Sequence, residues 1–189
     1  VKHQNKLGHF IHLPAQSGNS AVLEKMNRGY TREEYLEKVV KIKKAFPVVS
    51  LSTDIIVGFP GETDADFEDT LSMLREVQYE NVYGFKYSPR PFTKALKYTE
   101  QVPESVKDER LYKLLALQDE LAPVFAKKYE DQVLDVLVEG PSRSNPDVLM
   151  GRTTHNKVVN FTGPATVIGQ IVPVKIMRVA PFALRGELQ

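Results

Sequence analysis

Residues 51–63 read LSTDIIVGFPGET, and this stretch decides the fold. The run 51–57 is rich in β-branched residues and predicts a buried strand, 58–62 is a glycine-containing turn, and Thr63 is placed to cap a helix. Apolar residues follow at helical spacing, at Phe67, Leu71 and Leu74. They indicate one buried helix face, so the stretch is predicted to be a strand, a tight turn and an amphipathic helix.

The same pattern stands on both sides of this unit. Upstream, 10–14 is an apolar strand candidate ended by proline, 15–20 is a small polar loop, and a capping box at 31–34 begins a second amphipathic helix. Downstream, 82–87 is a third strand. Strands that alternate with helices predict parallel βα units, whose sites lie in the loops beyond the carboxyl ends of the strands. Three such units do not close a barrel.

The pattern changes after a long helix predicted over 103–131, which Pro123 is expected to kink. Short strands rich in Val and Ile follow, separated by Gly and Pro, at 132–139, 157–162 and 171–179. This spacing is typical of a small antiparallel β-barrel. The predicted fold is therefore α/β, with βα units over 1–131 and a β-barrel domain over 132–189.

Composition sets the broad class of the 189-residue chain. It is 42% hydrophobic and 26% charged, with a net charge of +1, which is typical of a globular protein. There is no apolar run near the ~18 residues that span a bilayer and no hydrophobic signal-peptide segment at the start, so a cytoplasmic protein without a membrane partner is expected. The chain has no cysteine, which excludes disulfides and thiolate metal sites within it.

Candidate ligand-binding residues stand in the two βα loops. Glycines in the 58–62 turn let a backbone approach a nucleotide-like cofactor; a tight turn that needs glycine for geometry alone is the alternative. Gln16 and Ser17 occupy the corresponding loop after the first strand, where helix capping is the alternative role. Asp54 lies in an apolar run and is predicted to be buried, either paired or serving the site. The expected cofactor-side residues are Gln16, Ser17, Asp54, Gly58, Pro60, Gly61 and Glu62.

No metal site is expected from the histidines. His3, His9 and His12 have no cysteine partners and no HExxH spacing on a helix.

The barrel domain carries a candidate RNA-binding set. Residues 132–189 hold 6 Lys and Arg against 4 Asp and Glu, so bulk charge argues little, and the positions of the basic residues matter more. Cations interleaved with amide and aromatic side chains suit phosphates and bases, whereas solvated barrel charges are the alternative. The expected RNA-binding residues are Arg143, Arg152, Asn156, Lys157 and Arg178.

Several separated motifs, in order, resemble one family. They are FIHLPAQSG at 10–18, MNRGYT at 26–31, TDIIVGFPGET at 53–63, YSPRP at 87–91 and GRTTHNKVVNFTG at 151–163. Together they resemble the MiaB-type tRNA methylthiotransferases, which are radical-SAM enzymes. The family's CxxxCxxC loop and its N-terminal domain have no counterpart in these residues, and the family's usual PGTPA is replaced by PFTKA at 91–95.

The resemblance implies the C-terminal part of a radical-SAM partial (TIM-like) barrel followed by a TRAM domain. It implies S-adenosylmethionine and two iron–sulfur clusters as cofactors, the tRNA anticodon stem-loop as partner, and methylthiolation of the isopentenylated adenosine next to the anticodon. The thiolates that such clusters need are absent here, so this chain alone is expected to be inactive. Two alternatives stand: a methylthiotransferase that modifies a ribosomal protein, and a non-catalytic RNA-binding protein.

Overall fold

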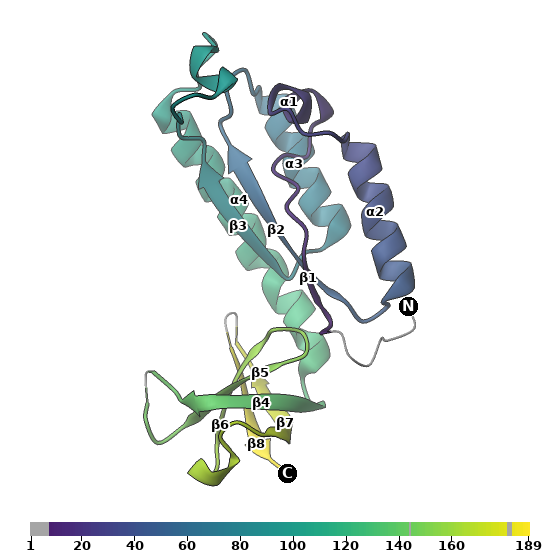
Figure 1. The fold of residues 1–189 in the computed structure, drawn as a ribbon, viewed down its shortest axis with the longest axis vertical. Coiled ribbons are helices and arrows are strands. Elements are labelled where there is room, and N and C mark those ends of the chain that lie inside the picture. Colours follow the sequence, from purple (N-terminus) through teal and green to yellow (C-terminus); the bar gives the residue numbers. More distant parts are fainter. Residues whose placement is uncertain (1–7, 144, 181–182) are drawn as a thin grey trace. The chain divides into compact units, whose positions relative to one another are not determined.

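The computed structural model describes residues 8–143, 145–180 and 183–189, which fall into two compact units (Figure 1). One unit comprises residues 11–121, and the other comprises 8–10 together with the described residues of 122–189. The division falls inside a helix, ten residues before the domain boundary that the sequence predicts near residue 131. The predicted boundary stays a prediction.

The unit over residues 11–121 is a parallel sheet with helices on one face (Figure 1). Its three strands stand in the order β1-β2-β3. Between Phe10 and Ala126 the elements are β1 (Phe10–His12), α1 (Ser20–Lys25), α2 (Arg32–Ala45), β2 (Ser50–Val57), α3 (Asp64–Val77), β3 (Asn81–Lys86), the short 3-10 helix η2 (Lys94–Lys97) and α4 (Glu104–Ala126). The strand–helix alternation predicted from the sequence is confirmed.

Capping residues fix where the helices begin. Thr31 and Thr63 each form a complete capping box, in which the threonine hydroxyl and the carboxylate three residues later bond reciprocally to backbone N–H groups. Asn19 caps α1 by accepting N–H bonds from Ala21 and Val22. The two threonine caps therefore begin their helices where the sequence predicts.

The hydrophobic core of this unit lies between the sheet and its helices. From β2 it takes Leu51, Ile55 and Val57, all at most 2% exposed. Alternate residues of a strand point to opposite faces, so Ser52, Asp54 and Ile56 point to the other face of the sheet. The helices cover one sheet face only, which leaves the second face for other contacts.

The remaining strands close a small barrel in the order β4-β5-β6-β8-β7. Its strands are β4 (Val133–Pro141), β5 (Leu149–Thr153), β6 (Val158–Thr162), β7 (Ile171–Val179) and β8 (Leu184–Leu188), with 3-10 turns η3 (Lys127–Tyr129) and η4 (Ala165–Val167). The barrel is confirmed, but the sequence prediction missed β5 and β8. It also expected antiparallel pairing throughout, whereas β6 and β8 pair in parallel to close the barrel.

Helix α4 runs through Pro123 and ends at Ala126, where η3 takes over. The predicted helix over 103–131 is therefore five residues too long at its C-terminus.

No helix within the described ranges has both the length and the apolar character needed to cross a bilayer.

Candidate functional site

The carboxyl ends of the three strands meet at one edge of the sheet, and the predicted cofactor loops lie there. Beyond β1 the chain stays beside β2: the Gln16 N–H donates to the Asp54 carbonyl at 2.8 Å, and the Ile56 N–H donates to the Gln16 carbonyl at 2.9 Å. Gly58 follows directly after β2. The structure thus brings the 15–20 loop and the 58–62 turn to the same edge.

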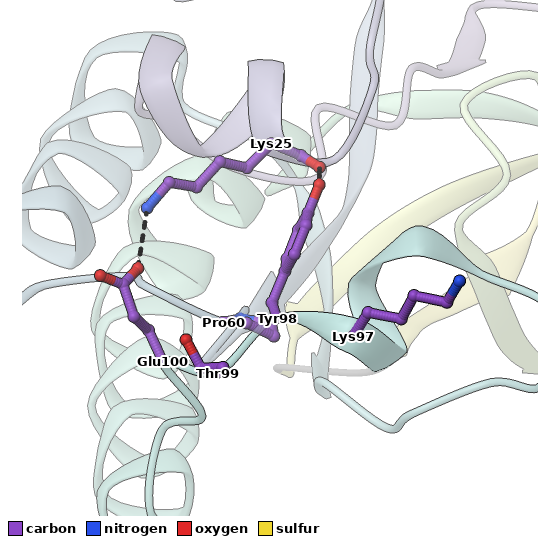
Figure 2. A pocket seen from close by; sticks show the side chains of 6 residues that line it. All are labelled: Lys25, Pro60, Lys97, Tyr98, Thr99 and Glu100. Carbon is purple, nitrogen blue, oxygen red and sulfur yellow. Dashed lines mark hydrogen bonds and ion pairs between the residues drawn. The ribbon is translucent and has the colours of Figure 1, made fainter.

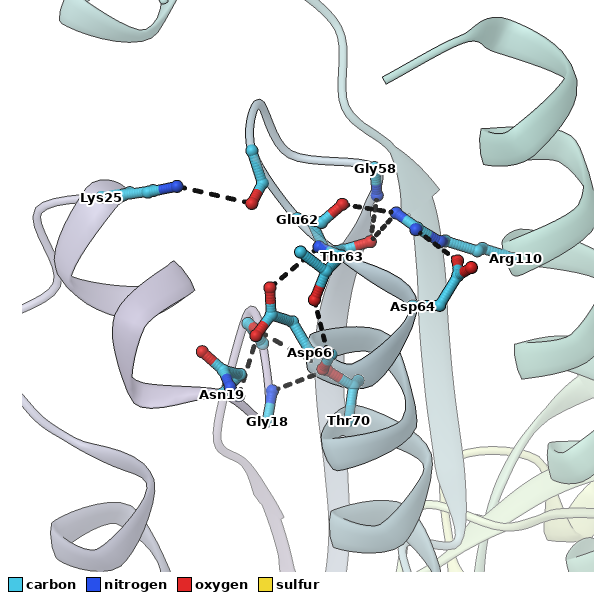
Figure 3. Close-up of polar contacts among 12 residues, drawn as sticks. Gly18, Asn19, Lys25, Gly58, Glu62, Thr63, Asp64, Asp66, Thr70 and Arg110 are labelled. Carbon is cyan, nitrogen blue, oxygen red and sulfur yellow. Dashed lines mark hydrogen bonds and ion pairs between the residues drawn. The ribbon is translucent and has the colours of Figure 1, made fainter. Parts of the chain in front are cut away.

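Gln16 and Ser17 are both buried and both engaged by protein groups. Gln16 has a positive φ of 71°, and its Oε1 accepts a hydrogen bond from Arg28 Nη2 at 3.0 Å. The Ser17 hydroxyl accepts the Asn19 N–H at 3.2 Å. The neighbouring Gly18 N–H donates to the Thr70 hydroxyl at 2.9 Å, which ties the loop to α3 (Figure 3). These contacts shape the loop itself.

The 58–62 turn is closed from within by Glu62 (Figure 3). The Glu62 carboxylate accepts the Gly58 N–H at 2.8 Å and an N–H of Arg110 Nη1 at 2.8 Å. The side chains of Glu62 and Arg110 are 2% and 6% exposed. Burial raises the pKa of the Glu62 carboxyl, and the Gly58 N–H and the Arg110 guanidinium oppose that rise.

Arg110 was missed by the sequence analysis, although it links α4 to the turn. Its Nη2 donates to Asp64 at 2.7 Å, and this hydrogen bond lowers the pKa of the Asp64 carboxyl. A single arginine on a long helix gives no sequence signal of a partner 48 residues away. Glu62, predicted to serve a cofactor, therefore has a clear structural role in holding the turn.

The two glycines of the turn are explained by their protein surroundings. Gly58 and Gly61 have φ of 72° and 77°, a region that side chains other than glycine adopt at a cost. A Cβ on Gly58 would collide with Lys107, and one on Gly61 would meet Lys25 and Glu100. These contacts support the geometric interpretation of the turn; its cofactor role stays a prediction.

Pro60 lines a small pocket of about 330 Å³ on the outer side of this turn (Figure 2). The other lining residues come from α1, from the end of η2 and from the segment after it, and are Lys25, Lys97, Tyr98, Thr99 and Glu100. That segment is fastened to the turn, because the Gly61 N–H donates to the Glu100 carbonyl at 2.7 Å. The pocket is therefore built around the same turn as the predicted cofactor loop.

Tyr87 is a second edge residue that the sequence analysis did not select. It follows β3, its N–H donates to the Val57 carbonyl at 2.8 Å, and its ring packs edge-on against Phe59. Its hydroxyl oxygen is buried and has no hydrogen-bond partner among the described residues. A buried hydroxyl without a partner is costly, so this group is an unsatisfied polar atom of the segment that follows β3.

Asp54 does not join these loops, and the prediction that it is buried is wrong. Its side chain is 30% exposed and points to the sheet face opposite the helices, where its Oδ2 lies 3.4 Å from His12 Nε2. The apolar run around it suggested burial because its alternate residues pack into the core.

No cluster of three or more potential metal ligands occurs in residues 8–143, 145–180 and 183–189, and His3 lies outside them.

The predicted RNA-binding residues lie on the barrel in two groups. Arg152 on β5 donates from Nη1 to Asn156 Oδ1 at 2.9 Å and lies 3.2 Å from Glu139, so it is partly neutralised. Asn156 has a positive φ of 60° in the turn that leads to Lys157 and β6, which matches the turn-forming alternative for this residue. Arg143 is exposed just after β4.

Arg178, the remaining predicted residue, belongs to a row of register partners across three neighbouring strands. Arg178 on β7 pairs with Arg185 on β8, and Arg185 pairs with Asn160 on β6. Both arginines are exposed. Like charges directly opposite on a sheet repel, so an anion between them would be stabilising. The sequence could not predict that Arg178 and Asn160 lie near each other, because β8, the strand between theirs, was not predicted.

These two units define a class of protein. Residues 4–74 match the radical SAM superfamily, and residues 127–189 match the TRAM domain. The fold is also similar to coproporphyrinogen III oxidase from Escherichia coli, described as a radical SAM enzyme, with a TM-score of 0.51 at 14% identity over 77% of this chain and 41% of that one. The chain thus joins a radical-SAM-type α/β layer to a TRAM barrel.

Closer relatives carry a single name. The chain is 51% identical to the tRNA-2-methylthio-N(6)-dimethylallyladenosine synthase of Bdellovibrio bacteriovorus, and 55% and 54% identical to those of Geobacillus thermodenitrificans and Bacillus subtilis. Each alignment covers 100% of this chain and 41%, 36% and 37% of the relative. The predicted resemblance to the tRNA methylthiotransferases is confirmed, and the chain spans about two fifths of their length.

Proposed function

We propose that this chain forms the C-terminal part of a tRNA methylthiotransferase that adds a methylthio group to the isopentenylated adenosine next to the anticodon. The observation that carries the proposal is an identity above 50%, along the whole chain, to enzymes named for that reaction. The order of the radical SAM and TRAM segments supports it as well.

In this proposal the TRAM barrel provides the RNA-binding surface. Arg178 and Arg185 stand as neighbouring cations with Asn160 beside them, a set that can bind phosphates and a sugar or base. The anticodon stem-loop is the partner proposed. Arg152 and Lys157 extend the basic surface along β5 and the turn after it.

The carboxyl edge of the sheet is proposed to form one wall of the S-adenosylmethionine pocket. Tyr87, whose buried hydroxyl has no hydrogen-bond partner among the described residues, supports a polar ligand at this edge, beside Phe59 of the 58–62 turn. S-adenosylmethionine and an iron–sulfur cluster together supply the radical chemistry of the superfamily. The chain has no thiolate to hold a cluster, so its own part is to bind and orient.

RNA binding across a salt series tests the proposal. A tRNA anticodon stem-loop should bind the chain, and Arg178→Ala or Arg185→Ala should each weaken binding and lower the log–log salt slope by roughly 0.7 to 0.9. Arg75→Ala, which removes an exposed arginine of α3, is the matched control and should leave both quantities unchanged.

A stem-loop that does not bind, or that binds all three variants alike, would refute this use of the barrel. The ribosomal-protein alternative would then gain support.

A further inference from the structure

The face of the sheet opposite the helices is a surface of mixed chemistry, here called the open face. It consists of His12, Ser52, Asp54, Ile56, Tyr83 and Phe85. Register places Asp54 beside Tyr83, and Ile56 beside Phe85, on adjacent parallel strands. Gly84, between the two aromatic residues, faces Leu111 and Leu114 of α4 instead, which confirms that Tyr83 and Phe85 point away from the helices.

Two aromatic rings and one carboxylate are accessible on this face. Tyr83 and Phe85 are 48% and 52% exposed, whereas Leu51, Ile55 and Val57 of the neighbouring strand β2 are at most 2% exposed. Tyr83 and Phe85 stand two residues apart on β3, so both exposed rings point to the same face and offer a surface that suits stacking by a planar ligand. This arrangement is not required by the core, because the core lies on the other face.

The carboxylate is held in one orientation by its neighbours. His12 Nδ1 lies 2.8 Å from the Ser52 hydroxyl, and His12 Nε2 lies 3.4 Å from Asp54 Oδ2. The His12 ring also meets the Tyr83 ring edge-on at 6.0 Å. Among the described residues, no hydrogen-bond donor reaches Asp54 Oδ1, which leaves a positioned acceptor beside an aromatic ring.

We infer that the open face binds a purine base that carries an exocyclic amine, with Tyr83 stacking on the base and Asp54 accepting the amine N–H. The inference rests on the proposed function, because it places the adenosine of the bound RNA here. An apolar partner fits less well, because it would bury the Asp54 carboxylate without offering a hydrogen-bond donor. A cation fits less well too, because the face presents a single carboxylate.

The test measures binding of two anticodon stem-loops that differ only in the base after the anticodon. One carries adenosine there, and the other carries inosine, which replaces the amine by a carbonyl. The parent chain should prefer adenosine. Asp54→Asn should reduce that preference about tenfold, because the amide can donate to the inosine carbonyl. Tyr83→Ala should weaken adenosine stem-loop binding roughly fivefold or more, and Tyr83→Phe should retain it.

Matched controls come from the exposed side of α4. Tyr112→Ala and Asp119→Asn remove the same groups there and should leave affinity and base preference unchanged. Circular dichroism melting of each variant establishes that the fold is kept.

Two failures are distinguishable. If neither stem-loop binds the parent chain, the proposed function fails together with this inference. If both bind but Asp54→Asn and Tyr83→Ala behave like their controls, the open face does not hold the base, and the RNA-binding function stands without it.

Discussion

Replacing Arg110 by methionine should destabilise the sheet unit more than any exposed charge change. The substitution removes the cation that faces the buried Glu62 carboxylate and leaves the Gly58 N–H as its remaining donor among the described residues. Removing one partner of a buried ion pair costs roughly 3–5 kcal/mol, because the other charge stays desolvated. Methionine keeps much of the side-chain volume, so the loss of stability comes from the missing charge rather than from a cavity.

The pH dependence of this loss has a definite sign. Burial raises the pKa of the Glu62 carboxyl, and the variant lacks the Arg110 guanidinium that opposes this rise. A carboxyl whose pKa is raised in the folded state favours folding when protonated, and this contribution disappears as pH rises through the folded pKa. The deficit of the variant should therefore be largest near about pH 7 and shrink toward about pH 4.5.

Urea unfolding followed by circular dichroism, with hydrogen exchange over β2 and α3, measures this loss. Lys113→Met is the control, because its pair with Glu109 on the same helix is exposed and is expected to contribute little to stability. The double variant Glu62→Gln/Arg110→Met should recover most of the stability, since it removes both charges and keeps an acceptor for the Gly58 N–H. A single variant that loses no more than the control, or a deficit that does not shrink in acid, would refute the reasoning.

Three further predictions concern the turn, the barrel and the cofactors. Gly58→Ala should cost about 1–3 kcal/mol, because of its positive φ and the collision with Lys107, whereas Gly29→Ala, with open space around it, should cost little in the same urea titration. Asn156→Gly should preserve the barrel's melting temperature better than Asn156→Ala, since glycine adopts φ of 60° without strain. Anaerobic treatment of the chain with iron, sulfide and reductant should give neither cluster absorbance nor 5′-deoxyadenosine; finding both would contradict its assignment as a cysteine-free part of the enzyme.

Local signals in the sequence predicted the sheet unit well. The Thr31 and Thr63 capping boxes and the β-branched run at 51–57 act over a few residues, and each element formed where those signals stand. The strand β8 was missed because Leu184–Leu188 contains glycine and two charges and is defined by pairing with two distant strands. Its strand character comes from tertiary contacts, which no window of sequence contains.

The candidate site divides in the same way. The meeting of the 15–20 and 58–62 loops at one edge follows from parallel strands and was predictable. Arg110 and the pairing of His12 with Asp54 were not, because both depend on partners more than 40 residues away. Asp54 also shows the limit of hydrophobicity: an apolar run predicts a strand with a buried face, but not which of its residues stand on that face.

The parallel pairing of β8 with β6 gives the barrel a late closing step during synthesis. Until Leu184–Leu188 has left the ribosome, β6 and β7 each present an unpaired edge, because β8 stands between them. The core of the βα layer contains none of those residues, so the layer can begin to fold before they are synthesised. A nascent chain stalled within the barrel would thus carry a folded layer and two exposed strand edges, the state most open to mispairing with another copy.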